Sequence, residues 1–145
     1  MKIRDAVPTD VPGIAALERE CFSLPWSEEI IASQLTGEGK IMLAADEDGM
    51  LAGYMGLQYV LDEGYISNVC TAPGFRRRGV AGALIDEMVS RARALGLSFL
   101  SLEVRVSNVP AISLYSGRGF VNVGLRPGYY EKPTEDAMIM NLALV

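Results

Sequence analysis

The sequence contains no histidine, and this absence removes several kinds of catalytic site at once. Ser-His-Asp and Cys-His catalysis both need an imidazole to activate the nucleophile. Histidine is also a common zinc ligand, so a zinc site becomes a poor candidate and we expect no metal. Acid–base chemistry in this chain must therefore use carboxylates, tyrosine, lysine or bound water.

Cysteine is scarce as well, with only Cys21 and Cys70 in the chain. Without a secretory signal, two cysteines are more often buried thiols than a disulfide. No apolar run approaches the roughly 20 residues of a membrane span. The N-terminus also lacks the apolar segment of a signal peptide. We therefore expect a cytoplasmic protein with free, buried thiols and no contact with a membrane.

The length of 145 residues suits one compact domain, covering residues 1–145. The net charge of −5 disfavours nucleic acid as a partner and favours basic partners. Positive charge is nevertheless concentrated at Arg76, Arg77 and Arg78. A local cationic spot on an acidic protein points to an anionic ligand more strongly than the total charge does.

Hydrophobic spacing predicts a mixed α/β fold in the order β-α-α-β-β-β-α-β-α-β-β. This order differs from a regular βαβ alternation, so we expect a mixed sheet with helices on its faces. The expected strands are 2–7, 40–45, 50–61, 64–71, 98–106, 120–125 and 137–145, the expected helices are 11–21, 27–35, 79–95 and 108–117, and 126–136 is expected to be a long loop.

The stretch from Asn68 to Ile85 carries the densest ligand-binding signal and is expected to form a strand end, a turn and a helix start. A helix N-terminus has unpaired N–H groups and a partial positive charge, so it attracts phosphate. Gly79 and Gly82 would let the backbone approach such a ligand closely. The three arginines oppose the helix dipole, and a bound anion would offset that repulsion. The turn therefore predicts a phosphate-bearing ligand.

Two known phosphate fingerprints fit this turn poorly. A dinucleotide site needs G-x-G-x-x-G, whereas the chain has Gly79-Val-Ala-Gly82, although Glu103 could serve as a ribose-binding acid. A P-loop needs Gly-Lys-Ser/Thr, which does not occur. The pattern that does fit is Arg-x-x-Gly-x-Ala, from Arg76 to Ala81.

Glu103 and Tyr115 are the candidate acid–base residues. Glu103 lies near the carboxyl end of its expected strand, as Thr71 does on the preceding one, and ligands of open α/β sheets bind at such ends. In a dry crevice it could act as a base; on a half-exposed strand it would be a solvated side chain. Tyr115 shares a helix face with Asn108, where the two could be a proton donor and a ligand contact, or a core aromatic and a helix cap.

Together these segments resemble the GNAT superfamily of acetyl-CoA-dependent N-acetyltransferases, whose pyrophosphate motif Q/R-x-x-G-x-G/A is similar to Arg76-x-x-Gly79-x-Ala81. More narrowly, nearly the whole chain resembles the bacterial ribosomal-protein-alanine N-acetyltransferases (RimI type). The segments that carry the narrower resemblance are Pro25-Trp26-Ser27, Asn68-Val69, Leu102–Asn108, Ala111–Tyr115, Gly119-Phe120, Tyr129-Tyr130 and Glu135–Met140.

The resemblance implies a GNAT fold, with a sheet splayed at its centre to form a V-shaped cleft, and acetyl-CoA as the cosubstrate. It implies that Glu103 is the base and Tyr115 the acid in a direct transfer. Cys70 stands where an apolar residue is usual, which leaves the backbone contacts of that strand intact. The acetyl-CoA-binding residues that it implies are Val69, Cys70, Thr71, Arg76, Arg77, Arg78, Gly79, Val80, Ala81, Gly82, Asn108 and Tyr115.

The implied acceptor is the N-terminal α-amine of a protein, foremost the N-terminal alanine of a basic ribosomal protein of the small subunit. Its site is expected between the loops that carry Pro25, Trp26, Tyr129 and Tyr130. One alternative is a GNAT enzyme for lysine side chains or a small-molecule amine. Another is a CoA-binding regulatory module without turnover, which would need neither Glu103 nor Tyr115.

Overall fold

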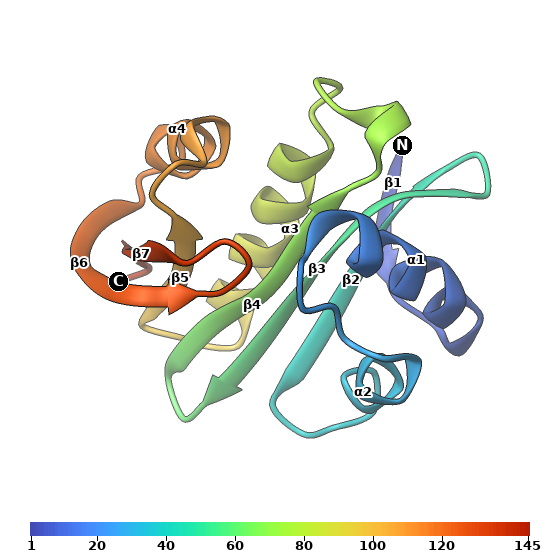
Figure 1. Ribbon diagram of the computed structural model, residues 1–145. Coiled ribbons are helices and arrows are strands. Elements are labelled where there is room, and N and C mark those ends of the chain that lie inside the picture. The colour runs from blue at the N-terminus through green and yellow to red at the C-terminus, as the bar shows by residue number, and fades with distance from the viewer.

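The computed structural model describes residues 1–145 and centres on one seven-stranded sheet (Figure 1). The order of strands across the sheet is β1-β2-β3-β4-β5-β7-β6. The strands are β1 (Lys2–Asp5), β2 (Lys40–Glu47), β3 (Met50–Val60), β4 (Glu63–Thr71), β5 (Phe99–Arg105), β6 (Val121–Tyr130) and β7 (Glu135–Ala143). The helices are α1 (Val11–Cys21), α2 (Glu28–Ser33), α3 (Val80–Ala94) and α4 (Val109–Gly117), with 3-10 turns η1 (Pro8–Asp10) and η2 (Pro73–Phe75).

The helices cover the sheet on two faces, and each face has its own hydrophobic core. Helix α3 packs on one face, where Leu43, Met55 and Leu84 belong to a cluster of 19 buried residues. Helix α1 packs on the opposite face, where Ile14 and Tyr54 belong to a second cluster of 9. Figure 1 shows α1 and α2 in front of β2 and β3, with α3 behind the sheet. The predicted mixed sheet with helices on its faces is confirmed.

Sequence periodicity explains the elements that border the cleft. Along α3, the residues Val80, Leu84, Met88 and Ala92 recur every four positions and are all buried. Along β5 the residues alternate, so Leu100, Leu102 and Val104 are buried on one face while Ser101, Glu103 and Arg105 lie on the other. The predicted helix 79–95 and strand 98–106 are confirmed as α3 and β5.

The sheet parts between β4 and β5. These strands are parallel and pair only from Glu63↔Phe99 to Tyr65↔Ser101. Just beyond that point β4 has a bulge, because its pairing with β3 jumps from Leu57↔Ile66 to Met55↔Val69. A bulge bends the strand that contains it, so β4 turns away from β5. The expected splayed sheet is thus present, and its cause is local to β4.

The predicted loop 126–136 is wrong for most of its length. Strand β6 continues to Tyr130 and β7 begins at Glu135, so only four residues, 131–134, connect them. Pro127 misled the prediction because proline usually interrupts a sheet. Here it lies on an edge strand, at a register shift between Arg126 and Tyr130, where no hydrogen bond is lost. No helix of the structure is both long and apolar enough to cross a membrane.

Candidate active site

One cleft, with a volume of about 1420 Å³, opens where β4 and β5 separate. Its α3 end is formed by residues 69–71 of β4 and by Arg76, Arg77 and 79–82 at the start of α3. Its loop end is formed by residues 20–24 and Trp26, at the end of α1 and in the α1–α2 loop, and by residues 129–131, at the end of β6 and the start of the β6–β7 connection. Glu103 and Tyr115 line the same cavity. The cleft therefore joins the predicted phosphate turn to the predicted acceptor loops.

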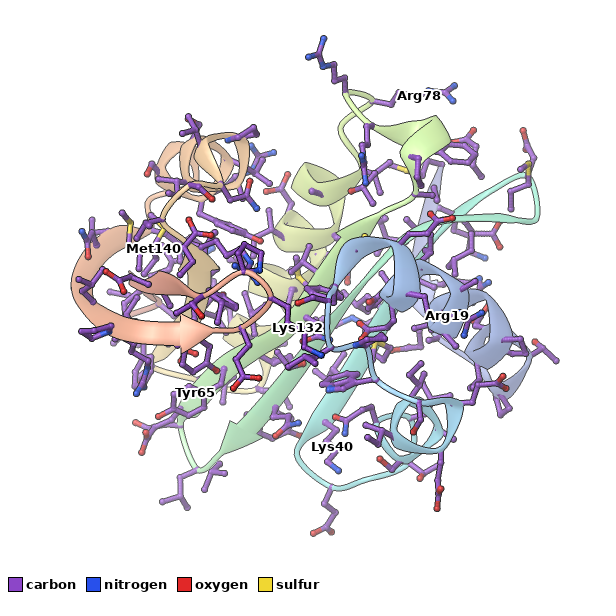
Figure 2. The ribbon with its side chains drawn as sticks, in the orientation of Figure 1. Arg19, Lys40, Tyr65, Arg78, Lys132 and Met140 are labelled. Atoms are coloured by element: carbon purple, nitrogen blue, oxygen red, sulfur yellow. A yellow bond between two sulfur atoms is a disulfide. The ribbon has the colours of Figure 1, made fainter.

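The turn at the α3 end has two residues in the left-handed region, Arg77 with a φ of 64° and Gly79 with a φ of 78°. This double reversal leads directly into the first turn of α3, whose N–H groups have no intrahelical partner. Arg76 and Arg77 line the cleft, but Arg78 does not. The Arg78 guanidinium instead lies over the ring of Phe75, 5.3 Å from its centroid, at the rim of the molecule (Figure 2). The predicted role of Arg78 in ligand binding therefore gains no support from its position.

Strand β4 brings Val69, Cys70 and Thr71 to the cleft, as predicted. Its edge toward β5 is open beyond Tyr65, so backbone groups on that side lack a strand partner. The expectation of two free thiols is wrong, because a disulfide joins Cys70 to Cys21, with the Cα atoms 6.3 Å apart. Cys21 is the last residue of α1, and the bond ties that helix end to β4.

Glu103 projects from β5 into the cleft with its side chain 27% exposed. The Arg126 Nε atom lies 3.3 Å from Glu103 Oε1. The Glu103 carboxylate also lies near the Tyr129 hydroxyl, and this neighbour raises the pKa of Tyr129. The carboxylate is therefore charge-paired and partly solvated, and the dry crevice considered from the sequence is absent.

Tyr115 lies on α4 and is only 5% exposed. Burial raises the pKa of Tyr115 to about 12, so its hydroxyl is protonated at neutral pH. Asn108 caps the same helix, with its Oδ1 accepting from Ala111 N at 3.3 Å, and also lines the cleft. The prediction that Asn108 and Tyr115 share a face is confirmed.

Tyr130 connects Tyr115 with Glu103. The pKa of Tyr130 is raised to about 12, first by burial and then by the nearby Tyr129 and Glu103, with a smaller effect from Tyr115. All four side chains line the same cleft, and the ring centroids of Tyr129 and Tyr130 lie 5.1 Å apart. The structure thus brings the two candidate acid–base residues to one place, beside the tyrosine pair predicted for the acceptor side.

The two loops at the loop end touch each other. Ser23 Oγ donates a hydrogen bond of 3.0 Å to the Glu131 carbonyl oxygen, 108 residues away in sequence. Figure 2 labels Lys132 on the β6–β7 connection, beside the α1–α2 loop. Trp26, Tyr129 and Tyr130 line the cleft, whereas Pro25 does not. The two segments predicted to form the acceptor side therefore make two walls of the cleft, and the Ser23–Glu131 hydrogen bond joins them.

Sequence reasoning missed Glu18, a fully buried carboxylate behind this wall. It accepts hydrogen bonds from Trp26 N at 2.7 Å, from Asn68 Nδ2 at 2.7 Å and from the Tyr54 hydroxyl. Burial, followed by this bond, raises the pKa of Tyr54. A signal was present: Glu18 falls on the apolar stripe of α1, one turn after Ile14. A carboxylate on an apolar stripe predicts a buried polar network.

Sequence reasoning also assigned no role to Arg105, although it alternates with Glu103 on one face of β5. Its side chain lines the cleft and donates hydrogen bonds to the β6–β7 connection. Both missed residues are charged. Glu18 holds the α1–α2 loop through Trp26, and Arg105 holds the β6–β7 connection.

Comparison with known proteins agrees with this geometry. The family model described as acetyltransferase (GNAT) family matches residues 11–120. The chain is 36% identical over 140 residues to the ribosomal protein bS18-alanine N-acetyltransferase of Escherichia coli K12, covering 94% of this chain and 93% of that protein. It is 30% identical over 145 residues to the protein of that name from Haemophilus ducreyi, covering 98% and 99% of the two chains.

The solved structures extend the likeness to three dimensions. The crystal structure of the Escherichia coli ribosomal-protein-S18-alanine N-acetyltransferase superposes with a TM-score of 0.91 at 34% identity, covering 99% of this chain and 93% of that one. The Ard1 structure from Thermoplasma volcanium gives a TM-score of 0.87 at 25% identity. The splayed mixed sheet is therefore the fold of these enzymes.

Proposed function

This chain belongs to the acetyltransferase (GNAT) family, and we propose that it transfers the acetyl group of acetyl-CoA to the N-terminal α-amine of a protein. The acceptor we propose is the N-terminal alanine of a basic ribosomal protein of the small subunit. The names of relatives at 30% to 36% identity support this substrate class. The observation that carries the proposal is the single cleft that joins the α3 turn, the pair Glu103 and Tyr115, and the two loop walls.

The α3 end suits the pyrophosphate and pantetheine of acetyl-CoA. Bound acetyl-CoA supplies an acetyl thioester that an amine nitrogen can attack. The free N–H groups at the start of α3 and the guanidinium groups of Arg76 and Arg77 would hold the phosphates. The open edge of β4 from Val69 to Thr71 would hold the pantetheine amides through backbone hydrogen bonds.

Glu103 would serve as the base, directly or through water. An α-amine is largely protonated at neutral pH, so a proton must leave before the nitrogen can attack. The ion pair with Arg126 orients the Glu103 carboxylate within the cleft. An ionised carboxylate in the cleft also attracts the cationic N-terminus.

Tyr115 would serve as the acid. Its pKa of about 12 keeps the hydroxyl protonated, so it can donate a proton to the thiolate that departs. Positioning both reactants in one cleft would supply much of the rate, without a covalent bond to the enzyme.

The loop end supports a peptide acceptor with positive charge. Three carboxylates, those of Glu20, Glu103 and Glu131, line this part of the cleft. They would attract a basic N-terminal segment, and Tyr129 and Tyr130 offer hydroxyl groups to its backbone.

The test is to incubate the protein with acetyl-CoA and matched peptides whose N-termini are free or blocked, each with an internal lysine. Product sites are mapped by tandem mass spectrometry. We expect acetylation of free N-terminal alanine only. Labelling confined to lysine, or to small amines in a parallel assay, would refute the α-amine assignment, and binding of acetyl-CoA without any turnover would support the regulatory module.

A further inference from the structure

Arg105 makes several contacts with residues 130–135, which form the β6–β7 wall on the proposed acceptor side of the cleft. Its Nη1 atom donates to the Pro133 carbonyl oxygen at 3.0 Å and to Glu135 Oε1 at 3.1 Å. Its Nη2 atom donates to the Glu131 carbonyl oxygen at 3.1 Å. The guanidinium carbon also lies 4.5 Å from the ring centroid of Tyr130. One side chain therefore holds four neighbours in and around the β6–β7 connection.

These contacts need the shape of arginine. The carbonyl oxygens of a four-residue connection have no strand partner, and a planar guanidinium can satisfy several of them at fixed angles. The Glu135 carboxylate is itself held by Ser107 N at 2.8 Å. The Ser107 side chain, followed by the contact with Arg105 and then by the Ser107 backbone N–H, lowers the pKa of Glu135, so the ion pair is maintained at neutral pH. A lysine ammonium has the charge but lacks the planar fork.

The position of Arg105 links this wall to the reacting centre. Arg105 and Glu103 lie two residues apart on β5 and both face the cleft. Both residues are paired with β7, Glu103 opposite Ile139 and Arg105 opposite Ala137, so the distance between the two side-chain origins is set by backbone geometry. The Glu131 carbonyl oxygen that accepts from Arg105 also accepts the hydrogen bond from Ser23. The α1–α2 loop, which forms the opposite wall, is therefore connected to β5 through Glu131.

We propose that Arg105 is a positioning residue that determines acceptor specificity, because it holds Tyr130 and residues 131–135 at a set distance from Glu103 and so limits which N-terminal residue fits. This inference rests on the proposed function. Loss of the guanidinium lets the connection move outward. Larger N-terminal residues then gain access while alanine loses its close fit.

The experiment compares Arg105→Gln and Arg105→Lys with the wild type. The control is Arg4→Gln, because Arg4 has a similarly exposed side chain (27% against 26%) and is held by Asp10 and Asp46, away from the cleft. Steady-state kinetics use acetyl-CoA and peptides that differ only in an N-terminal alanine, valine or leucine. Hydrogen exchange of residues 126–135 is measured in the same preparations.

We expect both Arg105 variants to raise the peptide KM at least tenfold, with the acetyl-CoA KM within twofold. The preference for alanine over valine in kcat/KM should fall at least fivefold, and exchange should accelerate in residues 126–135. Arg4→Gln should change none of these readouts. An unchanged alanine preference, equal rises in both KM values, or full rescue by Arg105→Lys would each overturn the proposal.

Failure of the proposed function would be recognised separately. If the wild type acetylates lysine or small amines but no α-amine, the proposed function fails, and the KM comparison is made with the amine that is used. Arg105 then fails as a positioning residue only if its variants leave that KM and the exchange of residues 126–135 unchanged.

Discussion

The α3 end and the loop end of the cleft differ in the atoms that build them. At the α3 end the ligand-facing groups are mostly backbone, shaped by the left-handed Arg77 and Gly79 and by the first turn of α3. At the loop end the walls are held by charged side chains, with Glu18 behind Trp26 and Arg105 behind residues 131–135. Backbone sites depend on φ angles, whereas side-chain sites depend on single residues. The two ends should therefore respond to different kinds of mutation.

Between the two ends, Glu103→Gln should have the largest effect. It removes the carboxylate that we propose as the base while keeping nearly the same shape, so kcat should fall about 10²- to 10⁴-fold. The affinity for acetyl-CoA, measured by calorimetry, should stay within about twofold because the α3 end is untouched. Glu87→Gln, which changes a half-buried carboxylate of α3 that does not line the cleft, serves as the control. A full rate in Glu103→Gln would mean that another group is the base.

At the loop end, Glu18→Ala should destabilise the whole fold. It leaves the buried Tyr54 hydroxyl and the partly buried Trp26 N–H and Asn68 amide without their partner. We expect the free energy of unfolding, measured with urea, to fall by about 3–5 kcal/mol. Glu20→Ala, on the exposed side of the same helix, should change it by less than about 0.5 kcal/mol. Equal losses in the two variants would contradict the buried network.

At the α3 end, Gly79→Ala should act through the backbone alone. Gly79 has a φ of 78° and nothing stands within 4 Å of an added Cβ, so the change costs only the left-handed conformation, about 1–2 kcal/mol. That cost should disturb the turn and raise the acetyl-CoA KM about tenfold. The peptide KM should change little.

Gly96→Ala is the matched control for Gly79→Ala, because Gly96 has a φ of 77°, equally open surroundings and a place at the far end of α3. Gly96→Ala should lower the free energy of unfolding by a similar amount and leave the acetyl-CoA KM unchanged. If both variants raise that KM alike, the turn has no special part in binding.

The smallest expected effect concerns Tyr115 and alkaline pH. Because burial raises its pKa from 10.0 to about 12, the folded state favours the neutral phenol. The resulting stability is fully present below pH 10 and is lost as pH rises through the folded pKa. Between pH 9 and pH 11, urea unfolding should show the wild type losing about 1 kcal/mol more than Tyr115→Phe. Parallel curves for the two proteins would mean that the phenol is solvated.

The sequence predicted regular elements well and an irregular one poorly. Helix α3 and strand β5 carry the periods of 3.6 and 2 that a one-sided core imposes, so their buried residues were readable. Strand β6 was half missed because Pro127 normally ends a strand. Only the sheet order shows that β6 is an edge, where proline costs no hydrogen bond.

In the candidate site, too, local features were predicted from the sequence and long-range contacts were not. The turn from Arg76 to Ala81 was identified from a local pattern, and most of its residues line the cleft. The disulfide between Cys21 and Cys70 was missed because it joins residues 49 positions apart. Glu103 was identified, but its pairing with Arg126 was not, since nothing local relates the two.

The sequence by itself determined the order of elements and the helix start at Gly79, because glycines, caps and periodic burial act over a few neighbouring residues. Only the tertiary structure decided how the loop end is held. Glu18 meets Tyr54 and Asn68 at separations of 36 and 50 residues, and Arg105 meets Glu131 across 26. Such contacts depend on how the sheet brings distant strands together, and no local pattern encodes that placement.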